Sequence, residues 1–222
     1  MVPFHPKQIL FEDNHLLVVN KLSGQLVQGD KTGDTCLAEE LKVYLKNKYQ
    51  KPGNVFCGVI HRLDRPTSGL VIFARTSKAL ERMNQQFRDK LVRKTYTALV
   101  QGNPKETEVL VHFLRKNESQ NKSYVVDATQ GKEAKLRYRI LQYYDTYSLI
   151  EIELETGRHH QIRSQMSHIG HPLRGDLKYG AKRSNEDGSI CLHASSIEFQ
   201  HPVNKALLKL EAPIPKNKIW LQ

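Results

Sequence analysis

The chain has 222 residues, of which 39% are hydrophobic and 26% charged, a composition ordinary for a soluble globular protein. This length suits one large domain or two small ones, and no apolar run approaches the roughly 20 residues that a membrane-spanning helix needs. The formal net charge of +11 favours a polyanionic partner, of which nucleic acid is the commonest.

The three cysteines, Cys36, Cys57 and Cys191, lie far apart in the sequence. Their odd number and wide spacing argue against a disulfide framework and against a zinc ribbon. The N-terminus, residues 1–6, has no apolar region typical of a signal peptide. A reducing cytoplasm is therefore the expected compartment.

The first half of the chain predicts two strands and two helices. Strands are expected at residues 16–19 and 69–74, because both are short apolar runs that suit a buried strand. Apolar residues at helical spacing predict helices at residues 37–49 and 78–89. The expected N-caps are Asp34 or Thr35 for the first helix and Thr76 or Ser77 for the second.

The second half is richer in strands. A helix is expected at residues 161–168 after Gly157, and the Gly- and Pro-containing residues 170–180 predict a loop. Strands are expected at residues 94–100, 136–141, 148–154, 197–199 and 207–210, and loops at residues 103–107, 116–123 and 144–146. Strands outnumber helices without strict alternation, which favours an α+β protein with an extended, largely antiparallel sheet. No linker stands out, so residues 1–222 are expected to form a single domain.

The segment from His61 to Leu70 is the first that can carry chemistry. Its carboxylate, Asp64, lies between Arg62 and Arg65, in a loop that Pro66 and Gly69 can hold in a defined conformation. Neighbouring cations favour the ionised form of a carboxylate, which nucleophilic attack on a sugar carbon requires. The alternative is an aspartate that only caps a turn while its arginines face solvent.

A second segment, residues 154–163, gathers polar side chains at the start of the expected helix. Helix N-termini favour anions, and Arg158, Gln161 and Arg163 lie near this one. A solvated basic helix start is the plain alternative. A zinc site formed by His159, His160, His168 and His171 is another, although no established ligand spacing supports it.

A third segment, residues 94–100, places Tyr96 on a strand. This ring can belong to the core, or it can offer a stacking face to a nucleobase.

These segments together resemble the RluA-like family of RNA pseudouridine synthases. Residues 61–70 are similar to the family's HRLDxxTSGL signature, residues 94–100 to its KxYxALV segment, and residues 154–163 to its LxTGRxHQIR segment. Residues 13–21 are similar to the family's opening strand, and residues 170–180 to its GxPxxGDxxYG segment. The resemblance runs in the family's order from about residue 9 to residue 215.

The sequence departs from the family's pattern at a few positions. Leu22 replaces a usual Pro, Ser164-Gln165-Met166 replaces a stretch that more often carries His and Leu, and Arg174 stands where an apolar residue is common. The chain is also expected to lack the N-terminal S4 RNA-binding domain of many relatives.

The resemblance implies an enzyme that detaches uracil from ribose in RNA, rotates it and rejoins it through carbon. This isomerisation is redox-neutral and needs no cofactor. The target base would be flipped out of its stack, and a basic surface would hold the RNA backbone. The implied fold is the pseudouridine synthase fold, an α+β fold with a long mixed, mainly antiparallel sheet, flanking helices and a central catalytic cleft.

The resemblance also assigns roles to individual residues. Asp64 would attack C1′ of the ribose, remove a proton from C2′, or attack C6 of uracil. Arg163 would pair with Asp64, and Tyr96 would stack on the uracil and help to remove its C5 proton. The residues expected to bind RNA or uracil are Arg62, Leu154, His61, Arg65, Arg158 and Gln161. Among these, His61 is also expected to shape the loop.

Two other functions stay open. A non-catalytic basic RNA-binding protein or RNA chaperone would use the same surface without the reaction, and a metal-dependent hydrolase would use the histidines. The expected partner is a ribosomal or transfer RNA stem-loop, with no membrane, no metal and no small-molecule cofactor. A monomer is the expected state.

Overall fold

The computed structural model describes residues 2–30 and 33–220. The chain divides into two compact units: the first comprises the residues up to Val92 together with Ser196–Ala212, and the second comprises Arg93–Ser195 together with the residues from Pro213. Strand β10 (Leu192–Gln200) therefore supplies its first four residues to the second unit and its last five to the first.

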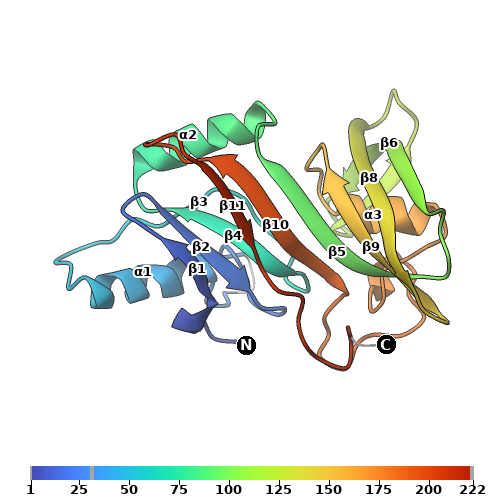
Figure 1. The fold of residues 1–222 in the computed structure, drawn as a ribbon, viewed down its shortest axis with the longest axis horizontal. Helices are drawn as coiled ribbons and strands as arrows, with labels where there is room; N and C mark the ends of the chain where they lie inside the picture. Colours follow the sequence, from blue (N-terminus) through green and yellow to red (C-terminus); the bar gives the residue numbers. More distant parts are fainter. Residues whose placement is uncertain (1, 31–32, 221–222) are drawn as a thin grey trace. The chain divides into compact units, whose positions relative to one another are not determined.

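The first unit is built on a sheet with a helix on each face (Figure 1). Its central strands β2 (Leu16–Lys21) and β4 (Ser68–Ala74) pair antiparallel, with β1 (Ile9–Glu12) beyond β2. On the other side of β4 lie β10 and, in antiparallel pairing with it, β11 (Leu207–Glu211). The short strand β3 (Gly58–Val59) pairs with the end of β4, and a 3-10 turn, Pro6–Gln8, precedes β1.

The two faces of this sheet are both apolar, because side chains alternate along a strand and both faces are covered. Leu17 and Val19 pack in the cluster of helix α1 (Leu37–Lys48), whereas Leu16 and Val18 pack in the cluster of helix α2 (Ser77–Arg88). This double burial explains why β2 is a continuous apolar run rather than an alternating one.

The helices confirm the predicted ranges to within one residue at most ends, but one predicted cap is wrong. Thr76 caps α2, and its side chain accepts a hydrogen bond from the Ala79 N–H at 3.2 Å. The N-cap of α1 is Cys36 rather than Asp34 or Thr35, and its side chain makes no capping bond. Asp34 instead forms an ion pair with Arg65 at 2.8 Å, so a tertiary contact has replaced the expected cap.

The second unit is an antiparallel sheet in the order β10–β5–β9–β8–β6–β7. Its own strands are β5 (Arg93–Gln101), β6 (Thr107–Asn117), β7 (Lys122–Val126), β8 (Lys132–Tyr143) and β9 (Tyr147–Leu154). Helix α3 (Gln161–His168) packs against β6 and β7, and a 3-10 turn, Leu177–Tyr179, follows it. The C-terminal segment closes a small cluster in which Trp220 packs with Leu99 and Cys191.

The predicted strands at residues 136–141 and 148–154 are confirmed as parts of β8 and β9, which pair antiparallel, and the limits of α3 are confirmed. The predicted loops at residues 103–107 and 116–123 are wrong in part, because β6 begins at Thr107, ends at Asn117 and pairs with β7 from Lys122. The outward side chains of β6 include Val109, Val111 and Arg115, a mixture without the clear polar alternation that marks a strand in sequence. The expected α+β class with flanking helices is confirmed; the central cleft stays a prediction.

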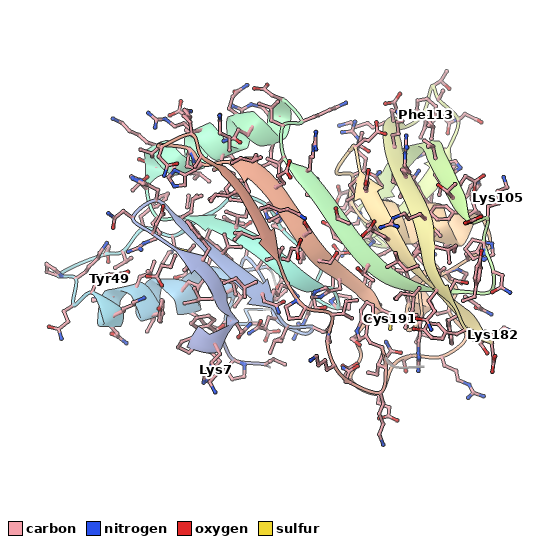
Figure 2. The ribbon with its side chains drawn as sticks, viewed as in Figure 1. Lys7, Tyr49, Lys105, Phe113, Lys182 and Cys191 are labelled. Carbon is pink, nitrogen blue, oxygen red and sulfur yellow. The ribbon has the colours of Figure 1, made fainter. Side chains whose placement is uncertain are left out.

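The described cysteines Cys36, Cys57 and Cys191 are buried and unpaired with one another. No helix within the described residues has both the length and the apolar character that crossing a membrane requires. Figure 2 shows lysines of both units on the exterior, among them Lys7, Lys105 and Lys182, all of them exposed.

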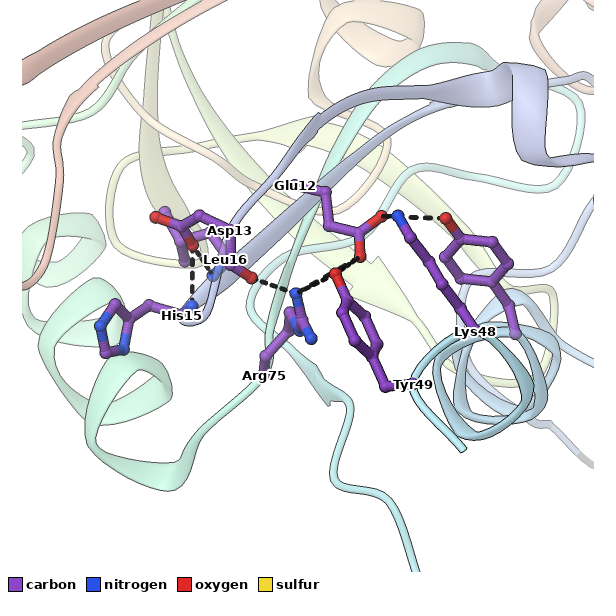
Figure 3. Close-up of polar contacts among 8 residues, drawn as sticks. Glu12, Asp13, His15, Leu16, Lys48, Tyr49 and Arg75 are labelled. Carbon is purple, nitrogen blue, oxygen red and sulfur yellow. Dashed lines mark hydrogen bonds and ion pairs between the residues drawn. The ribbon is translucent and has the colours of Figure 1, made fainter. Parts of the chain in front are cut away.

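A nearly buried carboxylate, that of Glu12, ties α1 to the sheet of the first unit (Figure 3). It accepts hydrogen bonds from Tyr49 Oη at 2.6 Å, Lys48 Nζ at 2.9 Å and Tyr44 Oη at 3.0 Å. Arg75 lies 3.4 Å from the same carboxylate and stacks on the Tyr49 ring. Burial alone would raise the pKa of Glu12, but these hydrogen bonds and the Lys48 charge outweigh it and lower the pKa below the ordinary 4.5.

We expect Glu12→Gln to destabilise the protein by about 1–3 kcal/mol at neutral pH, because the amide keeps the size but loses the charge-assisted bonds. Since the folded pKa is lowered, the contribution of Glu12 is present above pH 4.5 and is lost as the pH falls through the folded value. Urea unfolding of the wild type and the variant at pH 7 and at lower pH measures the difference. The exposed Glu81→Gln is the control, and a stability difference that did not shrink in acid would contradict the assignment.

Candidate active site

Asp64 lies on the loop between β3 and β4 of the first unit and is partly exposed. Its backbone carbonyl accepts the Thr67 N–H at 3.0 Å, which closes a turn around Pro66. Gly69, at the start of β4, has φ +113°, a conformation that favours glycine. Pro66 and Gly69, noted in the sequence, thus help to give the Asp64 loop a defined conformation.

The loop rests on the buried side chain of Lys21, whose exposed fraction is 0%. Lys21 Nζ donates to the carbonyl oxygens of Arg65 at 3.1 Å and of Thr67 at 2.5 Å, on both sides of the Asp64 turn, and to Leu22 O at 3.0 Å. Burial lowers the pKa of Lys21 to about 7, the Asp64 carboxylate partly opposes this shift, and Arg65 adds to it. No role was predicted for Lys21, although it belongs to the opening segment that resembles the family.

The turn after β2 also supports the Asp64 loop through hydrogen bonds. Gly24 N–H donates to Arg65 O at 2.8 Å, and Ser23 Oγ donates to Pro66 O at 3.1 Å. The Arg65 side chain is itself engaged, by Asp34 at 2.8 Å and by the carbonyl of Gly24 at 3.2 Å. The first unit therefore uses the turn after β2 as a support for the Asp64 loop.

The two remaining predicted residues of this loop differ in their surroundings. Arg62 is exposed. His61 accepts the Ile72 N–H at its Nε2, at 3.1 Å, and its ring stacks on Phe87 with the centroids 5.1 Å apart. These contacts agree with the expectation that His61 shapes the loop.

Tyr96, Leu154 and Arg163 belong to the second unit. Tyr96 lies on β5 opposite Ile152 of β9 and is 8% exposed, and Leu154 is the last residue of the same strand β9. Lys94 lies two residues before Tyr96 on β5 and has its pKa lowered by burial. The second unit thus brings Tyr96 and Leu154 onto neighbouring strands.

Arg163 lies in the first turns of α3 and is 5% exposed. Its guanidinium forms a two-bond ion pair with Asp176, with Nε donating at 2.7 Å and Nη2 at 2.9 Å. The predicted partner was Asp64, and that pairing stays a prediction. Asp176 is part of the segment that resembles GxPxxGDxxYG, but no sequence pattern connects it with Arg163.

The turn before α3 is held by Gln161, which is 3% exposed. Its Oε1 accepts from Thr156 Oγ1 at 2.8 Å and from the Arg158 N–H at 2.9 Å, and its Nε2 donates to Lys135 O at 3.1 Å. Arg158 is exposed and donates from Nε to Glu133 O at 2.8 Å. Gln161 thus has a structural function here, and its predicted contact with RNA stays a prediction.

The four histidines weighed as zinc ligands have separate partners. His159 contacts Ser123 Oγ at 2.9 Å, His160 contacts Tyr179 Oη at 2.9 Å, His171 contacts Gln101 O at 2.8 Å, and His168 packs edge-on against His112. Across residues 2–30 and 33–220, no group of three or more His, Cys, Asp or Glu side chains could hold a metal ion.

Comparisons with known proteins agree with one another. The sequence profile of a family described as RNA pseudouridylate synthase matches residues 15–168. The chain is 38% identical over 216 residues to ribosomal large subunit pseudouridine synthase C of Pasteurella multocida, covering 94% of this chain and 64% of that protein. It is 35% identical over 223 residues to ribosomal large subunit pseudouridine synthase D of Zymomonas mobilis, covering 96% of this chain and 70% of that protein.

Among solved structures, the fold is similar to human RNA pseudouridylate synthase domain containing 4, with a TM-score of 0.78. That likeness covers 95% of this chain and 89% of the other at 23% sequence identity. It confirms the fold that the resemblance implied.

We expect Lys21→Met to lower stability by about 1–3 kcal/mol, because the Thr67 carbonyl loses its Lys21 donor, and the carbonyls of Arg65 and Leu22 each keep only a backbone N–H donor. The folded pKa of Lys21 is lowered from 10.5 to about 7, so the unfolded chain binds more protons between these values. Wild-type stability from this group therefore rises with pH across that window.

Urea unfolding at pH 6.5 and at pH 9.5 tests this, with the exposed Lys46→Met as control. The stability difference between the wild type and Lys21→Met should grow at the higher pH. A difference that is the same at both pH values would show that Lys21 does not titrate in this range.

Proposed function

Because the chain belongs to the RNA pseudouridylate synthase family, we propose that it isomerises uridine to pseudouridine in RNA, with Asp64 as the catalytic carboxylate. The observation that carries the proposal is the match of residues 15–168, which includes the loop of Asp64, the strand of Tyr96 and the helix of Arg163. In this proposal residues 1–222 act as a single catalytic domain.

The reaction breaks the bond between N1 of uracil and C1′ and forms a bond between C5 and C1′. A proton leaves C5 and N1 ends protonated, so no oxidant, reductant or cofactor is consumed. Asp64 would begin it by attack at C1′, by proton removal from C2′ or by attack at C6. Each route needs an ionised carboxylate in a fixed position, which the braced loop on Lys21 supports.

In the same proposal Arg163 pairs with Asp64 and orients it, while Tyr96 stacks on the flipped uracil and helps to remove the C5 proton. Leu154 packs against the base, and Arg62 contacts phosphate or fills the gap left by the flipped nucleotide. Arg65, Arg158, His61 and Gln161 complete the RNA-binding set, the last two by shaping the surfaces that touch RNA. The net charge of +11 supports binding to the RNA backbone.

We propose ribosomal RNA of the large subunit as the substrate, because the relatives in the comparisons are named for it. A transfer RNA stem-loop is the second candidate. We also propose that the protein works as a cytoplasmic monomer. A map of pseudouridine in total RNA, from cells lacking this gene and complemented by the wild type, identifies the substrate directly. Sites that vanish on deletion and return with the wild type support the proposal.

We expect Asp64→Asn to abolish pseudouridine formation while RNA binding persists, because the amide keeps the size but cannot act as a nucleophile or base. Turnover on the mapped RNA and the dissociation constant of that RNA measure the two effects. Substantial turnover by this variant would contradict the assignment. Equal function of the wild type and the variant in cells would favour the alternative of a non-catalytic RNA-binding protein.

We expect Tyr96→Phe to keep RNA affinity, because the ring still stacks, and to lower kcat by about 100-fold if the hydroxyl moves the C5 proton. Single-turnover kinetics on the same RNA measure this. Normal kcat would limit Tyr96 to stacking. Tyr138→Phe is a control in the same unit, since its hydroxyl is bound to Glu108 at 3.1 Å and has no part in the proposed chemistry.

A further inference from the structure

The Arg163 guanidinium is fixed along one edge. Asp176, which is 1% exposed, engages Nε through Oδ2 at 2.7 Å and Nη2 through Oδ1 at 2.9 Å. A guanidinium carries five N–H groups in a planar fork, and this pair uses two of them on the Nε side. Two parallel bonds restrict rotation of the plane, so the Nη1 side has a defined direction.

The face of the guanidinium is also held. Arg163 Cζ lies 5.0 Å from the centroid of the Tyr179 ring. The Tyr179 hydroxyl accepts the Ser123 N–H at 2.8 Å and contacts His160 Nδ1 at 2.9 Å, so the ring itself cannot turn freely. Lys122 Nζ lies over the same ring at 4.9 Å, which adds a second positive charge near the site.

The backbone around Asp176 leaves little freedom. Gly175 has φ +85°, and a Cβ at this position would lie 2.5 Å from Asn185 Nδ2 and 2.6 Å from Ser189 O. The carbonyl of Asp176 accepts two backbone N–H groups, those of Tyr179 and Ala181, both at 3.0 Å. The glycine therefore permits the close packing that places the Asp176 carboxylate, and the turn after it holds that carboxylate in place.

Charge gives a second reason for the pair. A buried, uncompensated arginine is costly, and the neighbouring Lys122 makes the region more positive. Asp176 compensates the Arg163 charge. Arg163 can therefore orient a second carboxylate while attracting it less strongly than an uncompensated arginine would. A weaker positive field leaves that second carboxylate more reactive as a base or nucleophile.

We propose that Asp176 is a positioning residue of the reaction: it sets the orientation of the Arg163 guanidinium toward Asp64 and moderates its charge. This inference rests on the proposed function, in which Arg163 pairs with Asp64. Asp176 itself touches no reacting atom.

The first test is Asp176→Asn, assayed as kcat and KM on the RNA that the wild type modifies. The amide retains the shape but loses the charge and turns an N–H donor toward the guanidinium. We expect kcat to fall by about 100-fold with KM nearly unchanged, as for a misplaced catalytic group.

A role in folding alone would lower the melting temperature and leave kcat of the folded variant unchanged, and this separates the two explanations. Thermal unfolding checks that the variant is folded, and the exposed Glu186→Gln of the same unit is the matched control. The ¹⁵N resonance of Arg163 Nε should also move in Asp176→Asn, because its hydrogen-bond acceptor changes.

Asp176→Glu is the second variant, and it tests the positioning role of Asp176 if Asp176→Asn does not fold. It keeps the charge but places the carboxylate one methylene further out, so we expect kcat to fall with KM nearly unchanged. Wild-type kcat in a folded variant of either kind would overturn the role of Asp176 alone. A wild type that modifies no RNA would overturn the proposed function, and this role with it.

Discussion

A buried ammonium group, that of Lys21, fixes the loop on which the proposed chemistry depends. It joins the end of β2 to the carbonyl oxygens on both sides of the Asp64 turn. A lysine side chain is seldom fully buried, because desolvation disfavours its charge. Here three carbonyl acceptors match its three donors, and the Asp64 charge nearby favours the same ionised form. The catalytic candidate and its support therefore stabilise each other.

The second unit uses the same device with the charges reversed. There a buried carboxylate, Asp176, fixes the side chain of Arg163, and a turn with a glycine at φ +85° places the carboxylate. In each unit a buried group of opposite charge lies near the residue proposed for chemistry: Lys21 near the loop of Asp64, and Asp176 beside Arg163. Their main contribution is a defined geometry, which catalysis requires.

Much of the fold was predictable because local patterns and tertiary packing agree. The apolar residues of β2 and the Thr76 cap of α2 followed from spacing and capping alone. The cap of α1 was not predictable, because Asp34 pairs with Arg65, a residue 31 positions away that no local pattern indicates. Strands β6 and β7 were missed for a related reason: their outward faces mix apolar and charged side chains, so the period of two is weak.

The candidate site was predictable in its residues but not in their supports. The loop of Asp64 stood out because an aspartate between arginines is followed by Pro and Gly, and the resemblance then connected it with Tyr96 and Arg163. Lys21 and Asp176 carry no such signal, because their roles arise from contacts across 44 and 13 residues of sequence. Contacts between residues so far apart in the sequence can be identified only in the folded chain.

The predicted RNA-binding residues divide by the contacts that each already makes. His61 and Gln161 hold their own loops through backbone groups and rings, and the Arg65 side chain is bound to Asp34 and Gly24. Arg62 and Arg158 are exposed, and exposed arginines can reach a phosphate at little cost in broken contacts. Substituting Arg62 therefore removes a charge with little effect on the loop, whereas substituting Arg65 disturbs the support of Asp64 as well. Losses of RNA affinity and losses of turnover should accordingly separate between these two arginines, although only Leu63 and Asp64 lie between them.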